Sequence, residues 1–319
     1  MVTQFRQNGL LFLMLENAYI RIIILPAIGG KIVELTKKQS GTQFFLQPSR
    51  EYSNTRLPYY GADHLRYDPS GFDDCFPTIA ASTISTKDKN RQQMDIHFPD
   101  HGELWGIPWE YHVSEESVYL NVHGVRVNYE FSKSIRLDQT TVHINYRLIN
   151  LSDSPFMYIW SAQPLLEAHP GSEIILDASI DKVFLDWTTD SSIGQHGEYL
   201  PWPWLDRNQN SSLAISPPCG KQHTMKLYTD VLESGFCGYV RSDSGEKLFM
   251  EFDPRKIPYI GILLWYNAWP DDPGKTLYTV SLQPSSGRPD TLQQAYCNNE
   301  CSQINTFSME EWSLKMRVT

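Results

Sequence analysis

The sequence has no apolar run long enough to cross a membrane. The longest early runs cover residues 10–15 and 22–28, whereas a spanning helix needs about 20 consecutive apolar residues. A run of lysine and arginine is also missing, and 37 acidic residues outnumber 27 basic ones, giving a formal net charge of −10 at pH 7. An acidic chain without a basic patch repels a phosphate backbone. We therefore expect neither a membrane nor a nucleic acid as a partner.

Clustered cysteines are absent too. The five cysteines are scattered and none forms a CxxC pair: Cys75, Cys219, Cys237, Cys297 and Cys301. Because disulfide frameworks and zinc sites need ligands close together, neither is expected. The N-terminus also lacks a charged segment followed by an apolar stretch and a small-residue cleavage site. These absences favour a reduced, cytoplasmic protein without a metal.

Helical periodicity is missing as well, since no stretch longer than about ten residues repeats its apolar positions every 3.6 residues. Strand patterns occur instead at residues 10–15, 18–25, 31–36, 117–123, 125–135, 140–150 and 156–162. Residues 140–148 (TTVHINYRL) alternate between apolar and polar side chains, as a half-buried strand does. No linker or internal repeat interrupts the chain. The sequence predicts an all-β, antiparallel fold in one domain covering residues 1–319.

Two stretches, residues 47–90 and 191–220, are rich in turn residues and predict long loops. Loops of that length in a compact domain are usually binding elements or mobile lids.

Four segments in order resemble the aldose 1-epimerase, or galactose mutarotase, superfamily. They are SGFDDCFPTI at 70–79, PDHGELWGIPW at 99–109, WSAQPLLEAHPGSEI at 160–174, and YIGILLWYNAWP at 259–270 followed by LQPSSGRPDTL at 282–292. Each segment alone is a weak signal, but their order and spacing span about two hundred residues of the chain. The resemblance implies a β-supersandwich that binds a pyranose and uses no metal or organic cofactor.

The resemblance also places glutamines at two catalytic positions. In the family, a histidine before proline protonates the ring oxygen and a glutamate removes the proton of the anomeric hydroxyl. The matching residues here are Gln163, before Pro164, and Gln283, before Pro284. A carboxamide donates and accepts hydrogen bonds but does not titrate near neutral pH. Loss of either proton-transfer group costs a factor of roughly 10²–10⁴ in rate. The alternative is that both glutamines are ordinary strand residues.

Several other residues are candidates for the site. His101, in the motif Asp100–His101–Gly102, matches the family's second histidine and titrates near neutrality, so we predict that it is catalytic. Asp74 is its predicted partner, and Asp73 is predicted to contact the substrate. An apolar setting forces such a carboxylate to find a partner or raise its pKa, although capping of a turn would explain it equally well.

The remaining substrate-binding predictions are polar or aromatic. Sugar rings pack their C–H faces on aromatic planes, and charged or amide groups bind their hydroxyls. The predicted contacts are Arg66, Glu103, Trp105, Trp160, Tyr266, Asn267 and Trp269. For Arg66, an ion pair with Asp73 or Asp74 is the alternative. Glu167 and His169 follow Gln163 closely, but the strand is expected to end near Pro170, so we interpret them as loop residues.

These observations leave three hypotheses. The first is a repurposed isomerase or lyase acting on a sugar or sugar-like cyclic molecule, with His101 and a carboxylate as its acid–base pair. The second is a non-catalytic carbohydrate-binding or regulatory protein, for which two glutamines suffice. The third is ordinary aldose 1-epimerase activity. A small carbohydrate-like ligand is the expected partner in each, and the protein is expected to be a monomer or homodimer.

Overall fold

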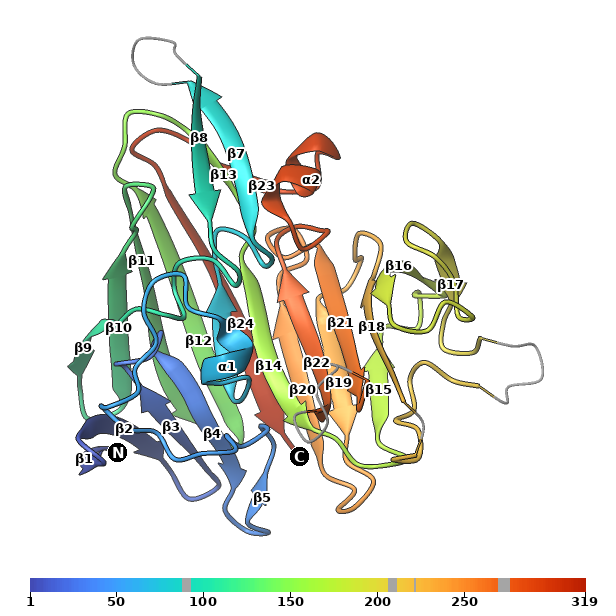
Figure 1. Cartoon of the computed structure of the whole chain (residues 1–319). Coiled ribbons are helices and arrows are strands. Elements are labelled where there is room, and N and C mark those ends of the chain that lie inside the picture. Colours follow the sequence, from blue (N-terminus) through green and yellow to red (C-terminus); the bar gives the residue numbers. More distant parts are fainter. Residues whose placement is uncertain (88–92, 206–210, 221, 269–275) are drawn as a thin grey trace.

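The computed structural model describes residues 1–87, 93–205, 211–220, 222–268 and 276–319. Figure 1 shows that strands dominate these ranges. The two helices described are short: α1 (His64–Tyr67) and α2 (Leu292–Cys297). Neither is long and apolar enough to cross a membrane.

A twelve-stranded antiparallel sheet forms the larger layer. Along this sheet the strands are β1 (Val2–Gln7), β2 (Leu10–Glu16), β3 (Ile20–Leu25), β4 (Lys31–Lys37), β6 (Phe72–Cys75), β14 (Ser161–Glu167), β22 (Tyr278–Ser285), β21 (Tyr259–Tyr266), β18 (His223–Tyr228), β16 (Lys182–Thr188) and β17 (Tyr199–Pro201), with β5 (Thr42–Gln43) beside β4.

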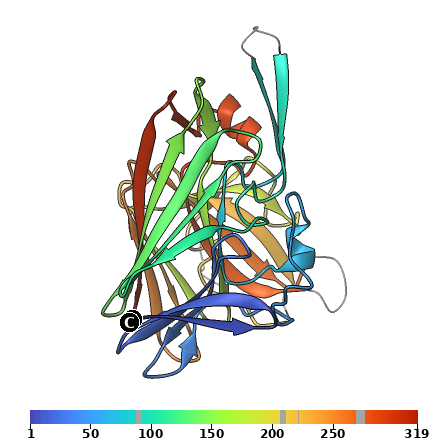
Figure 2. The same cartoon turned by 90° about the vertical axis from the view of Figure 1, so that its left-hand side faces the viewer.

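An eight-stranded antiparallel sheet forms the smaller layer. Its order is β15 (Glu173–Leu176), β19 (Phe236–Val240), β20 (Lys247–Phe252), β24 (Met309–Val318), β12 (Thr141–Asn150), β11 (Tyr129–Asp138), β10 (Ser117–His123) and β9 (Glu110–Val113). Two further pairs stand apart, β13 (Phe156–Tyr158) with β23 (Ser302–Ile304) and β7 (Ser82–Lys87) with β8 (Gln93–Phe98). The β7–β8 hairpin projects beyond both sheets in Figures 1 and 2.

The main hydrophobic core lies between the two sheets. It joins side chains such as Ile262 and Leu282 of the larger sheet to Ile144 and Leu314 of the smaller one, all fully buried. In β12 the buried and exposed residues alternate, as the sequence pattern predicts. The prediction of an all-β antiparallel fold is confirmed.

The central strands of the larger sheet are buried on both faces. Every residue of β21 and all but the first of β22 is buried, whereas a strand covered on one side would alternate. The face turned away from the smaller sheet, which we call the outer face, is covered by loops and by α1 (Figures 1 and 2). A polar residue on this face is therefore shielded from bulk water.

Candidate functional site

Neighbouring strands place a cross-strand row on the outer face. In spatial order the row contains Asp73 of β6, Gln163 of β14, Gln283 of β22, Gly261 of β21 and Tyr228 of β18. The β14–β22 register is the same on both sides of this position, so Gln163 lies opposite Gln283. Directly opposed residues of antiparallel strands have Cα atoms about 4.5–5.5 Å apart and side chains on the same face. The two carboxamides therefore lie side by side.

His101 is held at both ring nitrogens. Its Nδ1 lies 2.7 Å from Oδ2 of Asp100, and its Nε2 lies 3.1 Å from Nε2 of Gln163. A carboxylate only accepts hydrogen bonds, so Nδ1 carries the proton. The Gln163 Oε1 accepts from the Cys75 thiol at 2.8 Å, which leaves its amide hydrogens facing the imidazole. Nε2 of His101 thus presents a lone pair, as a general base does.

The carboxyl group of Asp100 is suited to this contact. Burial opposes its ionisation, but the neighbouring His101 outweighs burial and lowers the pKa of Asp100. A charged Asp100 fixes the tautomer of His101 and would stabilise the imidazolium formed when Nε2 takes a proton.

A tight turn sets the position of His101. The residue has φ of 62°, in the left-handed region that side chains with a Cβ avoid, at a cost of roughly 1–2 kcal/mol. Its amide donates to the carbonyl of Ile79 at 2.6 Å. Gly102 follows with φ of 71°, and a Cβ there would stand 2.1 Å from the carbonyl oxygen of Phe76. The chain thus holds His101 in an unfavourable conformation that aims its ring at Gln163.

A second imidazole, His64 of α1, stacks on His101. The ring centroids are 3.9 Å apart and the planes differ by 15°. Its Nε2 lies 3.2 Å from Oδ2 of Asp73, the oxygen that Lys31 contacts at 2.9 Å. Burial and the adjacent His101 lower the pKa of His64 to about 4, although Asp73 acts against them. His64 is therefore neutral at pH 7.

Asp73 has one carboxylate oxygen that is free to accept a hydrogen bond from a ligand. Burial opposes ionisation of this carboxyl, but Lys31 and His64 together outweigh burial and lower the pKa of Asp73. Its other oxygen, Oδ1, is buried and has no hydrogen-bond partner among the described residues. An unsatisfied buried carboxylate oxygen costs about 1–3 kcal/mol or more, so this atom is suited to accept from a bound hydroxyl.

The other end of the row carries a cation. The Lys226 ammonium donates to Oε1 of Gln283 and lies 3.1 Å from Oδ1 of Asp290, which also accepts from the Tyr228 hydroxyl. Asp186 lies at a bulge in β16. Burial, and then repulsion by Asp290, raise the pKa of Asp186 to about 6, with Lys226 acting against them. This end of the row therefore includes a carboxyl group that titrates near neutrality.

An apolar strip borders the row on the same face. Leu165, Leu263 and Trp265 form a buried cluster, with Leu65 of α1 and Trp187 packed against it. Each of the three lies on a strand of the row, two or four residues from Gln163 or Gly261. A cyclic molecule on the outer face would meet amides and charges on one side and an aromatic surface on the other.

The structure does not bring Asp74 to His101. Successive residues of a strand face opposite sides, so Asp74 points between the sheets while Asp73 joins the row. Asp74 accepts from Lys133 at 2.8 Å and from Nε1 of Trp160 at 3.1 Å. Trp160 is 1% exposed and packs in the core. Asp74 and Trp160, both predicted to belong to the site, are instead a structural pair between the sheets.

Glu103 and Arg66 also lie away from the row. Glu103 is buried, and its oxygens accept from the hydroxyls of Tyr60 and Tyr129 and from two backbone amides. These contacts leave it a structural anchor for the loop that carries His101. The Arg66 side chain is 84% exposed and pairs with Asp63. Trp105 is buried and its ring is perpendicular to that of His64, with the centroids 4.9 Å apart, so it supports the imidazole pair.

The predicted site residues of the 259–270 segment do not share one location in the structure. Tyr266 faces the core, where its hydroxyl contacts Ser216 at 3.2 Å. Asn267 directly follows β21, has φ of 57° and donates to the carbonyl of Cys219. Trp269 lies outside the described residues. Trp265, one position before the predicted Tyr266, lies instead on the outer face.

Sequence reasoning missed Lys31, His64, Lys226 and Asp290. Lys31 and Lys226 lie in strands, where a charge inside an apolar segment needs a partner or a role, so their settings in KIVEL and MKLY were usable signals. His64 lies in the predicted loop 47–90 and Asp290 in the matched segment 282–292, but nothing within either stretch singles the residue out, because only the folded chain brings it to the row. Among the described residues no group of three or more His, Cys, Asp or Glu could hold a metal ion.

Comparison with solved structures identifies the fold. A galactose mutarotase-like protein from Clostridium acetobutylicum matches with a TM-score of 0.68 and 12% identity, covering 100% of this chain and 98% of that one. A galactose mutarotase related enzyme from Lactobacillus acidophilus matches with a TM-score of 0.67 and 14% identity, covering 97% of each chain. A galactose mutarotase-like protein from Lactobacillus casei matches with a TM-score of 0.64 and 12% identity, covering 97% of this chain and 100% of that one.

Comparisons of sequence reach less far. A family model described as a domain of unknown function, DUF5107, matches residues 4–61. A search of the curated proteins finds no match. At these identities the structures show a galactose mutarotase-like fold, and the function has to be argued from the site.

Proposed function

We propose that this protein is a repurposed isomerase-type enzyme, which exchanges the anomers of a sugar or sugar-like cyclic molecule with proton-transfer groups other than those that the resemblance implies. The observation that carries the proposal is the chain of contacts from Asp100 through His101 to Gln163. It leaves a basic nitrogen beside the two carboxamides. The galactose mutarotase-like fold of the solved neighbours supports a sugar as the ligand class.

Each part of the site has a task in this proposal. Gln163 and Gln283 bind hydroxyls, and Oδ1 of Asp73 accepts one more. Nε2 of His101 takes and returns a proton while Asp100 holds Nδ1. Trp265 packs on the C–H face of the ring. Since the Gln163 amide now occupies Nε2, the ligand hydroxyl would displace that hydrogen bond on binding.

The test is exchange spectroscopy by NMR, which measures the interconversion of two anomers at equilibrium. A panel of neutral hexoses and pentoses would be compared with buffer alone. We expect acceleration for at least one sugar, and a loss of roughly 10²-fold in the Asp100→Asn variant, which no longer fixes the His101 tautomer. Full activity in Asp100→Asn would contradict the role of His101.

A non-catalytic carbohydrate-binding function is the alternative. It is favoured by the two glutamines, because neither can transfer a proton. Calorimetry with the same panel separates the two functions. Binding without any acceleration of anomer exchange would support the alternative, whereas acceleration would exclude it.

A further inference from the structure

Lys226 lies at the centre of the half of the site that His101 does not reach. Its side chain is buried and its ammonium contacts Gln283 and Asp290, with the Tyr228 ring centroid at 4.9 Å. An ammonium has three N–H donors, and these contacts use two of them. The resemblance of the sequence implies a proton acceptor at position 283, yet the ionic group that the structure places there is a proton donor.

Gly261 makes this arrangement possible. It lies between Gln283 and Tyr228 in the row, where a side chain would project from the same face. A Cβ at this position would stand 3.1 Å from Oε1 of Gln283 and 3.2 Å from Nζ of Lys226. The missing side chain lets the ammonium and the carboxamide meet over the backbone of β21.

We propose, on the basis of the proposed function, that Lys226 is the catalytic acid of this site and His101 its base. The acid and the base then lie on opposite sides of the site from those that the resemblance implies. Nε2 of His101 takes the proton of the anomeric hydroxyl, and the C1–O1 bond becomes a carbonyl. The bond between C1 and the ring oxygen breaks, and the ring oxygen takes a proton from Nζ of Lys226. Reversal after rotation about C1–C2 returns both protons and gives the other anomer.

The two halves of the site fit these assignments. Asp100 lies where it can stabilise a positive charge formed on His101, as a base requires, and the Lys226 ammonium is positioned by its contact with the Asp290 carboxylate. Gln163 and Gln283 stand between the two groups and bind hydroxyls without competing for protons. The substrate orientation follows, with the anomeric hydroxyl toward His101 and the ring oxygen toward Lys226.

The first test is kinetic and includes a substitution, Gln283→Glu, whose expected effect has opposite signs under this proposal and under the assignment implied by the resemblance. Lys226→Met removes the acid and should lower the rate of anomer exchange by roughly 10²–10⁴-fold. Gln283→Glu installs a carboxylate beside Lys226, which would hold the proton and lower the rate at least roughly tenfold. If position 283 instead needs a base, Gln283→Glu raises the rate. That increase would overturn the proposal, as would full activity in Lys226→Met.

The second test needs no turnover and reports the orientation of the ring. The probes are 1-deoxynojirimycin, whose ring nitrogen is cationic, and 1,5-anhydroglucitol, which has oxygen there, together with the same pair in the galacto configuration. Lys226→Met removes the charge that faces the ring atom, so it should shift the ratio of the two dissociation constants at least roughly tenfold toward the cation. His101→Asn should leave that ratio unchanged.

The outcomes separate the two proposals. A shift in His101→Asn rather than in Lys226→Met overturns the assignment of Lys226, even if the wild type exchanges anomers. The expected shift in Lys226→Met without any anomer exchange supports the orientation and refutes the enzymatic function. Absence of binding by both probe pairs overturns both. Melting temperatures of the variants identify a substitution that fails to fold.

Discussion

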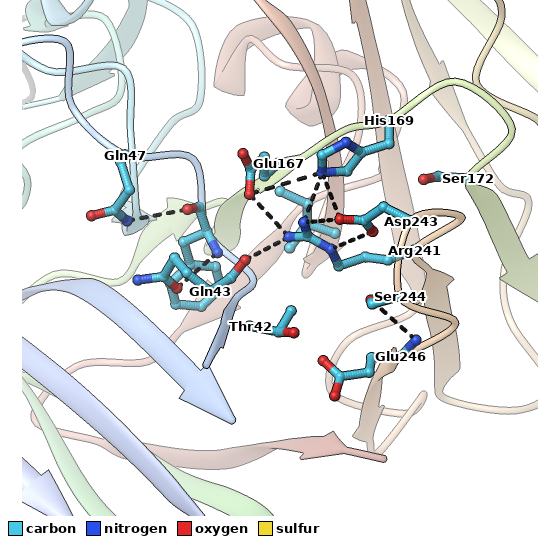
Figure 3. Close-up of polar contacts among 12 residues, drawn as sticks. Thr42, Gln43, Gln47, Glu167, His169, Ser172, Arg241, Asp243, Ser244 and Glu246 are labelled. Atoms are coloured by element: carbon cyan, nitrogen blue, oxygen red, sulfur yellow. Dashed lines mark hydrogen bonds and ion pairs between the residues drawn. The ribbon is translucent and has the colours of Figure 1, made fainter. Parts of the chain in front are cut away.

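Two clusters of charged side chains lie on the larger sheet or at its border, and they are built differently. One is the row with His101 and Lys226. The other, which we call the Arg241 cluster, gathers Glu167, His169 and Asp243 around the guanidinium of Arg241 (Figure 3). Both combine carboxylates, a histidine and a cation, so residue types alone do not separate them.

Saturation of hydrogen bonds separates the clusters. Arg241 donates to Asp243 through Nε and Nη2, to His169 through Nη2, and to Glu167 and the backbone carbonyl of Gln43 through Nη1. Its acidic partners are 40–45% exposed. The cluster ties β5 and the end of β14 in one sheet to the turn after β19 in the other. We therefore interpret the Arg241 cluster as a structural link between the two sheets and also call it the clasp.

The row, in contrast, is buried and incompletely paired. Oδ1 of Asp73 lacks a described partner, Lys226 has a donor to spare, and His101 is held in a left-handed turn. Such features cost stability and persist where a ligand uses them. The comparison shows that buried hydrogen-bond donors and acceptors without partners, rather than a high density of charge, distinguish the candidate site.

The largest expected effect comes from comparing one substitution in the candidate site with one in the Arg241 cluster. His101→Asn should lower the rate of anomer exchange by roughly 10²–10⁴-fold, because it removes the base. Arg241→Met should leave that rate unchanged. NMR exchange rates of both variants at equal concentration measure the contrast. Equal losses in the two variants would erase the distinction between site and clasp.

The second effect is the pH dependence of stability. His64 has a pKa of about 4 in the folded protein and about 6.5 when unfolded, so the unfolded chain binds more protons between these values. The free energy of unfolding should therefore fall as the pH drops from 6.5 to 4, by up to about 3 kcal/mol from this residue. Urea unfolding at intervals of pH measures the slope.

His64→Gln provides the matched variant, since a carboxamide can still donate to Asp73 but does not titrate. Its slope between pH 6.5 and 4 should be flatter than that of the wild type. The exposed His123, changed to Gln, serves as the control and should retain the wild-type slope. An unchanged slope in His64→Gln would show that His64 is not held neutral by its neighbours.

Much of the fold could be predicted from the sequence. The alternation of residues 140–148 identifies β12, and the order of the matched segments places Gln163 and Gln283 on one site. The structure sets the two opposite each other in adjacent strands. These predictions depend on local periodicity and on the order of motifs, both of which can be recognised in the sequence alone.

The errors arise where one residue changes the face of a strand. Asp73 and Asp74 are adjacent residues of the same type, but the pleat of the strand directs the side chain of Asp73 to His64 and that of Asp74 to Lys133. The same parity separates Trp265 from Tyr266. His64 reaches the row from α1 and Asp290 from the loop after β22, and periodicity within a segment does not record contacts between segments.

A smaller effect is expected from breaking the clasp. Arg241→Met removes charged hydrogen bonds to Asp243 and Glu167, whose carboxylates are already partly hydrated, so the cost is about 1–3 kcal/mol of unfolding free energy. Chemical denaturation of Arg241→Met and of Lys38→Met, which loses an exposed pair with Glu16, measures it. A loss no greater than that of Lys38→Met would remove the structural role of the clasp.

The smallest expected effect concerns Gly261, the position without a side chain in the row. Gly261→Ala adds a Cβ 3.1 Å from Oε1 of Gln283 and 3.2 Å from Nζ of Lys226, so one of these atoms must move. We expect about a tenfold loss of activity, equivalent to about 1.4 kcal/mol. Stability should change little, because alanine also restricts the unfolded chain. Gly220→Ala, where a Cβ meets no atom within 4 Å, is the control. Activity insensitive to Gly261→Ala would mean that the close approach of Lys226 and Gln283 has no role in the reaction.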